Sequence, residues 1–500
     1  MERHEQSNDI AKQKPGGHIM HGSLSDESLS SPATQLSPID EKALVRKIDR
    51  RLLPMLFIIY VAAFLDRYVS QAAVTMVALT IVPHRVNISN ALTMSLPKDL
   101  KLVGNQRNVA LCIFFVPYIL FEIPSNIFMK RFKPHIWCMV PLFSRDLLSG
   151  CILAFGIIML AQGFVKSYSG LLATRFFLGL CEAGIFPGSF YLISIWYKRE
   201  ESLQRFTVYW CSVLTASAFG GLLASAIQKM DGLRGLHNWQ WIFILEGVLT
   251  VLIGFSAFFL VTDFPEDAKW LTEEERTFII DRVGGIEKDQ TITSADVLKF
   301  FKSLKNVLGG VVVPVYSFAY FTPTIIKTYG YSVVETQLHT VPPFVAALVL
   351  CLITAYASDR LKLRWPFVMF GLILAIVGLA ILMTIHHSFS AEYAGICLVA
   401  MGIFTAGIAV VCWYVMNLQG HVERAIGTAW MIGFGNAGGI IATFSFLSTD
   451  APFYHTGYSI CIGAMCLGAA ACLLYGVLAV YHNRTLREAN GEKEARLYSL

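Results

Sequence analysis

Long apolar runs alternate with short polar segments along most of the chain, and polar residues concentrate in 1–51, 263–306 and 482–500. Several runs reach the roughly 20 residues that a helix needs to cross the hydrocarbon core of a bilayer. The runs lie at about 52–66, 107–128, 147–164, 171–195, 206–227, 240–262, 307–326, 338–357, 366–385, 393–413, 425–447 and 458–481. This pattern predicts six spanning helices, a long polar loop and six further spanning helices.

The distribution of basic residues predicts the orientation of these helices, because loops rich in Lys and Arg face the cytoplasm. With the first loop set aside, one set of loops holds ten basic residues: Lys130, Arg131, Lys133, Lys198, Arg199, Arg205, Arg360, Lys362, Arg364 and Arg424. The opposite loops hold four: Lys166, Lys229, Arg234 and Lys327. We therefore expect both termini and the 263–306 loop in the cytoplasm. In that loop Thr272 and Glu275 have the spacing of a capping box, which predicts a short helix.

The expected fold is an all-α membrane protein with two six-helix bundles. Its parts are a disordered cytoplasmic tail (1–45), an N-terminal bundle (46–262), a central cytoplasmic loop (263–306), a C-terminal bundle (307–482) and a second cytoplasmic tail (483–500). The basic turn KRFKP after the second span is echoed six spans later by SDRLKLR. A repeated half suits alternating access, because two similar bundles can rock about one central site.

Composition excludes several functional classes. Hydrophobic residues make up 55% and charged residues 15% of the chain, whereas charged residues of soluble proteins come nearer a quarter. The net charge of +5 includes no basic run of the kind that binds nucleic acid. The 11 cysteines lie in apolar stretches without CxxC or metal-ligand spacing. No nucleophile–base pair, histidine cluster or phosphate-binding loop is evident, so we expect neither an enzyme nor a bound cofactor or metal.

Charged residues inside the spans are the main candidates for function, because a charge there costs several kcal/mol unless it is paired or hydrated. Asp66 and Arg67 end the first run, and Arg175 and Glu182 lie seven residues apart in the fourth, on one helix face. An arginine offers a forked donor that suits a carboxylate, and a carboxylate removed from water can exchange a proton near neutral pH. These residues permit co-transport of a proton and an organic anion; structural pairing of Arg175 is the alternative.

Other features of the spans fit function or packing. Glu122 and Glu246 lie near helix ends, where we expect water to reach them, and Asn436 places an amide in the eleventh span. Small residues that allow close helix contact are Gly179, Gly184 and Gly188, with the glycines of 216–225 and 433–442. Four prolines predict kinks or breaks in the seventh and eighth spans: Pro314, Pro323, Pro342 and Pro343.

Ten strings between about residues 44 and 480 carry a family resemblance. They are FLDR, VNISNA, GNQRNVALCIFFVPYILFEIPSN, RFFLGLCEAGIFPG, IWYKRE, NWQWIFILEG, PVYSFAYFTPTIIK, NLQGHVER, GFGNAGGII and DAPFYHTGY. The chain resembles the major facilitator superfamily and, within it, the fungal allantoate permease family of anion:cation symporters; DFPEDAKWLTEEER is similar to nicotinate-transporter-like members. The resemblance implies twelve helices in two pseudo-symmetric domains. It also implies proton symport of carboxylates such as nicotinate, allantoate or a related ureide.

The resemblance assigns a role to Arg175, which matches a fourth-helix arginine tied to proton coupling. Together with Asp66, Arg67, Glu182 and Asn436, it forms the set that we expect to serve substrate binding and proton coupling. The expected partners are therefore a small organic anion, protons and the lipid bilayer. We expect a monomer in the plasma membrane.

A second set of residues is expected to gate the cytoplasmic face. Asp359, Arg360 and Arg364 match the superfamily's signature between the eighth and ninth helices, whose role is gating. Glu122 and Arg424 complete this expected set.

The chain departs from the family pattern after Arg67. In the family FLDR runs directly into the VNISNA-like string, whereas here the eighteen residues of 68–85 separate them and displace Asn87 and Asn90. One codon choice for residues 67–70 contains a fungal splice-donor sequence, so we interpret 68–85 as a retained intron or a gene-model error. Sequencing the transcript would test this. A second extra segment lies at about 138–147, and the seventh span is short.

Three alternatives remain open. The protein could export another substrate class, it could sense a nutrient without transporting it, or it could be the inactive product of a mis-spliced gene model. The short tails disfavour a sensor, and the family strings favour import over export.

Overall fold

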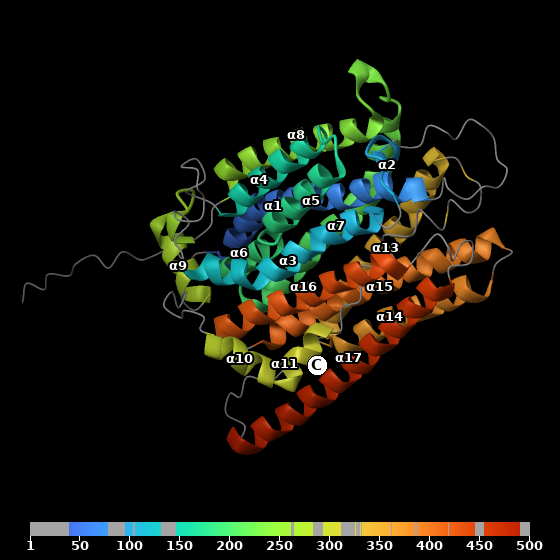
Figure 1. Cartoon of the computed structure of the whole chain (residues 1–500). Helices are drawn as coiled ribbons and strands as arrows, with labels where there is room; N and C mark the ends of the chain where they lie inside the picture. The colour runs from blue at the N-terminus through green and yellow to red at the C-terminus, as the bar shows by residue number, and fades with distance from the viewer. Residues whose placement is uncertain are drawn as a thin grey trace, which may run out of the picture. The chain divides into compact units, whose positions relative to one another are not determined.

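The computed structural model describes a chain of helices. The described residues are 40–78, 96–103, 106–131, 147–261, 265–283, 294–311, 326, 331, 333–361, 363–385, 388–418, 420–445 and 455–490. Within these ranges no strand occurs (Figure 1). Residues from Lys42 onward form one compact unit, and the contacts described below lie within it.

The helices follow the predicted spans in order. In the N-terminal half they are α1 (Glu41–Ala78), α2 (Leu96–Asp99), α3 (Gln106–Arg131), α4 (Leu147–Gln162), α5 (Tyr168–Glu182), α6 (Ile185–Trp196), α7 (Arg199–Gln228) and α8 (Asn238–Leu260). The central loop forms α9 (Glu273–Val283) and α10 (Ser294–Lys302). They continue with α11 (Leu304–Val311), α13 (Val333–Leu361), α14 (Trp365–Thr384), α15 (Phe389–Asn417), α16 (Gly420–Ser445) and α17 (His455–Asn490).

The first helix is longer than predicted. Its 38 residues span about 57 Å at 1.5 Å per residue, and it continues through 68–78 because the segment YVSQAAVTMVA is apolar and contains no proline or glycine. Residues 79–95 and 132–146 lie outside the described residues, including Asn87, Asn90 and most of the 138–147 segment. The interpretation of 68–85 as an intron or gene-model error therefore remains a hypothesis.

The fourth span, predicted over 171–195, is covered by two helices with a short turn between them. α5 ends at Glu182, a turn follows at Ala183 and Gly184, and α6 begins at Ile185. Pro187 lies in the first turn of α6, where its missing N–H is tolerated because the first donors of a helix have no intrahelical acceptor. The proline thus favours the start of a new helix over an uninterrupted series of backbone hydrogen bonds.

The eighth span shows the opposite behaviour. α13 runs as one helix from Val333 to Leu361 and contains both Pro342 and Pro343, so of the predicted kinks or breaks the break does not occur there. Neighbouring helices can compensate for hydrogen bonds that a proline removes inside a membrane. Pro314 and Pro323 lie outside the described residues.

Close backbone contacts join the helices within and between the halves. α3 packs on α5, α4 on α8, and α14 on α15, while α7–α13 and α3–α16 join the N-terminal and C-terminal halves. A Cβ on Gly179 of α5 would overlap the carbonyl oxygen of Phe114 in α3, which confirms the predicted role of this glycine in close helix contact. A Cβ on Gly439 of α16 would lie 2.6 Å from the Phe115 ring of α3.

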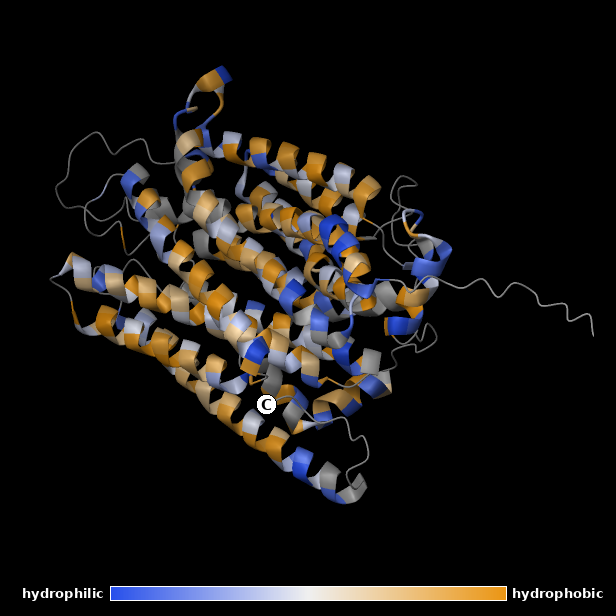
Figure 2. Cartoon of the chain, turned by 180° about the vertical axis from the view of Figure 1, so that it is seen from behind, coloured by the Kyte–Doolittle hydropathy of each residue, from blue (hydrophilic) through white to orange (hydrophobic). Residues whose placement is uncertain are grey.

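The outer faces of the helices are apolar. In the described part of the chain, five helices are long and apolar enough to cross a membrane: Asn238–Leu260, Leu338–Leu361, Trp365–Thr384, Phe389–Asn417 and His455–Thr485. Large hydrophobic side chains are exposed along them, among them Leu252, Phe255, Phe259, Ile353, Ile373, Leu467 and Val477. Figure 2 shows hydrophobic residues along the helices and hydrophilic residues near many helix ends. This distribution is that of a protein whose outer surface faces lipid.

The central loop is fastened to the N-terminal half by charged residues. The capping box is confirmed: the Thr272 N–H donates to Glu275 Oε2 at 3.0 Å and the Glu275 N–H donates to Thr272 Oγ1 at 3.2 Å. Glu275 also pairs with Lys47 of α1 at 2.8 Å, and Arg282 of α9 pairs with Glu201 of α7. The helix α9 is therefore held at both ends.

A test of helix packing is the change Gly179→Ala. The new methyl group must push α5 away from α3, which should lower the free energy of unfolding by about 1–3 kcal/mol. Thermal unfolding of the purified protein in detergent would measure it. Gly438→Ala is the matched control, because a Cβ there meets no atom within 4 Å; equal destabilisation by both changes would contradict the packing argument.

A second test concerns the pH dependence of α9 docking. Partial burial raises the pKa of Glu275, but hydrogen bonds from Lys47 and Thr272 outweigh it and hold this pKa below its ordinary value of 4.5. Because the folded pKa is lowered, the contribution is present above about pH 4.5 and is lost as the pH falls further. Glu275→Gln should therefore speed amide hydrogen exchange in α9 at pH 7 and make progressively less difference as the pH falls below 4.5. An equal effect at pH 7 and below pH 4.5 would rule out the charge pair as the cause.

Candidate functional site

Arg175 and Glu182 lie on the buried face of α5. The helix begins after Ser167, whose hydroxyl accepts a hydrogen bond from the Gly170 N–H at 3.2 Å, and the helix positions both charges in the interior. Its buried residues are Leu171, Arg175, Leu178, Gly179 and Glu182. Arg175 is 6% and Glu182 1% exposed. The structure thus confirms the expected common face, with about 10 Å of helix between the two residues.

Arg175 packs against α8. Its Cζ atom lies 5.8 Å from the centroid of the Phe243 ring, a distance at which an aromatic face attracts a cation. Glu246 follows Phe243 by three residues on the buried face of α8, one helical turn further along. The α5–α8 contact therefore places the arginine beside the turn of α8 that leads to a buried carboxylate.

The expectation that water reaches Glu122 and Glu246 is wrong. Glu122 is 0% and Glu246 3% exposed. Glu122 lies nine residues before the end of α3, where neighbouring helices cover it. Buried ionisable groups in a membrane are more indicative of function than groups at a wet helix end.

Asn436 lies buried on α16, which packs against α3. Neither its amide nitrogen nor its amide oxygen has a hydrogen-bond partner among the described residues. A buried amide with unused hydrogen-bonding capacity is suited to contact a polar ligand.

The expected gating set is only partly brought together. Arg364 pairs with Asp359 at 2.6 Å and donates to Ser358 Oγ at 3.0 Å, while Ser358 donates to the Leu363 carbonyl at 2.8 Å. Arg360 instead lies exposed and contacts the Tyr356 hydroxyl at 3.3 Å. The turn between α13 and α14 is therefore closed by an ion pair between a buried Arg364 and a partly buried Asp359.

The remaining expected residues are spread over other helices. Arg424 is half-buried on α16 and Glu122 is buried on α3. Asp66 and Arg67 lie in α1, but their side chains are outside the described part of the structure.

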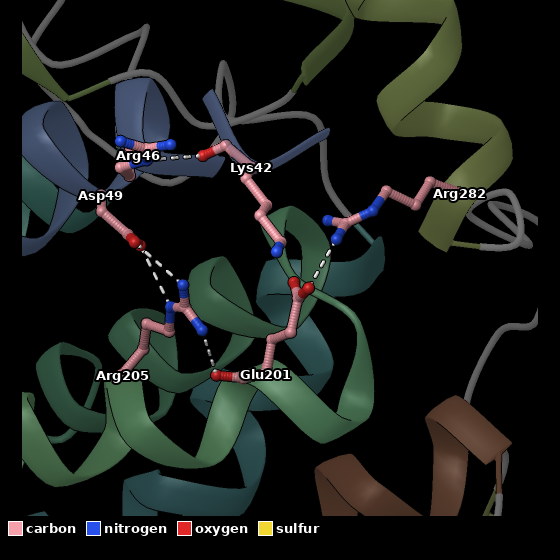
Figure 3. Close-up of polar contacts among 6 residues, drawn as sticks. All are labelled: Lys42, Arg46, Asp49, Glu201, Arg205 and Arg282. Carbon is pink, nitrogen blue, oxygen red and sulfur yellow. Dashed lines mark hydrogen bonds and ion pairs between the residues drawn. The ribbon is translucent and has the colours of Figure 1, made fainter. Parts of the chain in front are cut away.

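Sequence reasoning missed a polar cluster where α1 meets α7. Arg205 makes two hydrogen bonds to Asp49, at 3.0 and 2.8 Å, and a third to the Glu201 carbonyl at 2.9 Å. Its guanidinium also lies 4.8 Å from the centre of the Tyr197 ring. Figure 3 shows the hydrogen bonds of Arg205 to Asp49 and Glu201, with Arg282 reaching the Glu201 carboxylate. The signal in the sequence was Asp49, a lone acid in the basic stretch VRKIDRR.

The chemistry of these residues is that of binding and proton exchange. Arginine, carboxylate and amide side chains in an apolar interior can hold an anion and a proton. Among the residues that the structure describes, no group of three or more His, Cys, Asp or Glu side chains is placed to hold a metal ion.

A test of the ion pair is Arg364→Ala, which leaves the Asp359 carboxylate largely buried without its cation. We expect a loss of about 3 kcal/mol in the free energy of unfolding, measured by denaturation in detergent. Asp359→Asn in the Arg364→Ala background should add little, and Arg360→Ala, at an exposed position, should be close to neutral. Additive effects of the two changes at 359 and 364 would show that the pair is not coupled.

Comparison with known proteins agrees with this geometry. Residues 56–443 match the family model of the Major Facilitator Superfamily. The chain is 32% identical over 453 residues to the MFS-type transporter cnsO of Penicillium expansum, covering 87% of this chain and 82% of that protein. It is 29% identical over 468 residues to the high-affinity nicotinic acid transporter of Saccharomyces cerevisiae, covering 91% and 80%.

A solved structure shows the same fold. The proton:xylose symporter XylE superposes with a TM-score of 0.63 at 15% identity, covering 86% of this chain and 95% of that one. The family model spans most of the sequence, and several described helices are apolar enough to cross a membrane. The chain therefore belongs to the Major Facilitator Superfamily: it has that superfamily's helical membrane fold and is a transporter, not an enzyme.

Proposed function

We propose that the protein imports a small organic anion together with protons, by alternating access. The observation that carries this proposal is the burial of Arg175 and Glu182 on one face of α5. A cation in a low-dielectric interior binds an anion more strongly than in water. A nearby carboxylate that takes up a proton offsets the cost of moving the net charge.

The expected substrate is a carboxylate such as nicotinate, allantoate or a related ureide. The planar guanidinium of Arg175 fits a carboxylate with two parallel hydrogen bonds. The relative in Saccharomyces cerevisiae transports nicotinic acid, as its name states. Similarity to it over 91% of this chain supports nicotinate as the first substrate to test.

The two halves of the chain have separate parts in this proposal. Arg175 and Glu182 belong to the N-terminal half, whereas the buried amide of Asn436 comes from α16 in the C-terminal half. A substrate bound between them would contact both halves. The two halves would move relative to each other at the α7–α13 and α3–α16 contacts. Asp66 and Arg67 are further candidates for proton coupling. Asp359 and Arg364, with Glu122, Arg360 and Arg424, are the candidates for gating.

The proposal extends to family and placement. We assign the chain to the allantoate permease branch of the superfamily, in the plasma membrane, as a monomer with both termini in the cytoplasm. The loop charges support this orientation.

Uptake of labelled nicotinate by yeast that lacks its own transporter would test the function. Accumulation should rise as the external pH is lowered from 7 to 5 and should stop when a protonophore is added. Arg175→Lys keeps the positive charge but lacks the two parallel donors of the guanidinium. The apparent affinity for nicotinate should therefore fall roughly tenfold, or about 1.4 kcal/mol. Glu182→Gln should abolish accumulation against a gradient while still permitting exchange of bound substrate.

Lys229→Ala, at an exposed position after α7 and outside both sets of candidate residues, is the control and should transport normally. Allantoate is the second substrate to test with the same cells. Accumulation that continues after the protonophore is added would contradict proton coupling. Net efflux of preloaded substrate would favour an exporter.

A further inference from the structure

A hydroxyl group from α3 reaches the break in the fourth span. Ser125 Oγ lies 3.2 Å from the carbonyl oxygen of Ala183, the residue between α5 and Gly184. The same oxygen lies 2.8 Å from the carbonyl of Glu122, three residues earlier in α3. A serine hydroxyl has one proton to donate, so the two carbonyls share a single donor.

The two carbonyls differ in their need for this proton. In a continuous helix the carbonyl of Ala183 would accept from the N–H of residue 187, four positions later, but residue 187 is a proline and has no N–H. The carbonyl of Glu122 has the ordinary donor at Asn126, since α3 continues to Arg131. Ser125 therefore supplies to Ala183 a hydrogen bond that the sequence of the fourth span cannot make.

Ser125 joins the segments that carry two buried carboxylates. Ala183 directly follows Glu182, and Ser125 follows Glu122 on the same face of α3. We propose that Ser125 is a positioning residue: its hydroxyl closes the gap that Pro187 opens and so fixes the backbone beside Glu182. The coupling role of Glu182 rests on the proposed function, whereas the contact itself does not.

The consequence lies in the surroundings of Glu182. Without the Ser125 hydroxyl the Ala183 carbonyl lacks a donor inside an apolar region, where such a group is costly. The backbone that follows Glu182 is then no longer held against α3, and the surroundings of the Glu182 carboxyl group change with it. Loss of Ser125 should therefore alter the pH at which this residue exchanges its proton.

The experiment labels Glu182 with dicyclohexylcarbodiimide, which reacts with protonated carboxyl groups in apolar surroundings. The full-length purified protein is labelled between pH 5 and pH 9, and the peptide containing Glu182 is quantified by mass spectrometry. We expect Ser125→Ala to move the labelling profile along the pH axis by roughly half a unit or more. Ser125→Thr, which keeps the hydroxyl, should follow the wild-type profile.

Pro187→Ala provides the decisive background, because it restores an N–H that can bond to Ala183. Ser125→Ala should then have little effect on the labelling profile. A Ser125→Ala profile equal to wild type, or an equal shift with and without Pro187, would overturn the proposal. If Ser125→Ala alone fails to fold, the double variant should recover folding, and its failure to do so also overturns the proposal.

Labelling requires no transported substrate, so the two proposals can fail separately. A protein that does not accumulate nicotinate or allantoate but shows the expected labelling pattern has lost the proposed function and kept the role of Ser125. Normal proton-coupled uptake by the wild-type protein, with unchanged labelling in Ser125→Ala, would support the proposed function and overturn the role of Ser125.

Discussion

Hydrocarbon offers a membrane protein neither hydrogen-bond partners nor solvation for charge, and this constraint decides where the polar groups of this chain lie. Glu122, Arg175, Glu182 and Glu246 are all buried, and each lies on a helix that packs against another helix of the N-terminal half. Apolar side chains cover the outer faces instead. The interior of the helix assembly is thus the place where binding and proton exchange are chemically feasible.

Tight packing and interior charge are parts of one arrangement. Because Gly179 lets α5 approach the backbone of α3, the side chains before and after it, Arg175 and Glu182, are held against neighbouring helices rather than lipid. The contact of Gly439 with Phe115 brings α16 equally close to α3. One helix, α3, therefore packs against both the charged helix of its own half and a helix of the other half.

Some of this could be predicted from the sequence, because some features depend on one helix alone. Periodicity was enough to place Arg175 and Glu182 on one face. The burial of Glu122 and Glu246 depends on which helices cover them, which a linear pattern does not contain. The same holds for the turn after α13, where Arg364 joins the ion pair and Arg360 does not, although both match the same signature. The effect of proline was equally contextual, since it begins a helix in one span and lies within an unbroken helix in another.

The break in the fourth span separates two differently anchored segments. α5 is fixed by its contact with α3 and by Arg175 against Phe243. α6 ends at Trp196, which stacks on Trp270 of the central loop with ring centroids 5.6 Å apart, near the cluster that joins α1, α7 and α9. A movement of the central loop can therefore reach α6 directly through this ring contact. Glu182 is the last residue of the fixed segment, so it is the titratable group whose surroundings such a movement changes first. This placement gives a physical route by which the position of the central loop and the surroundings of Glu182 become linked.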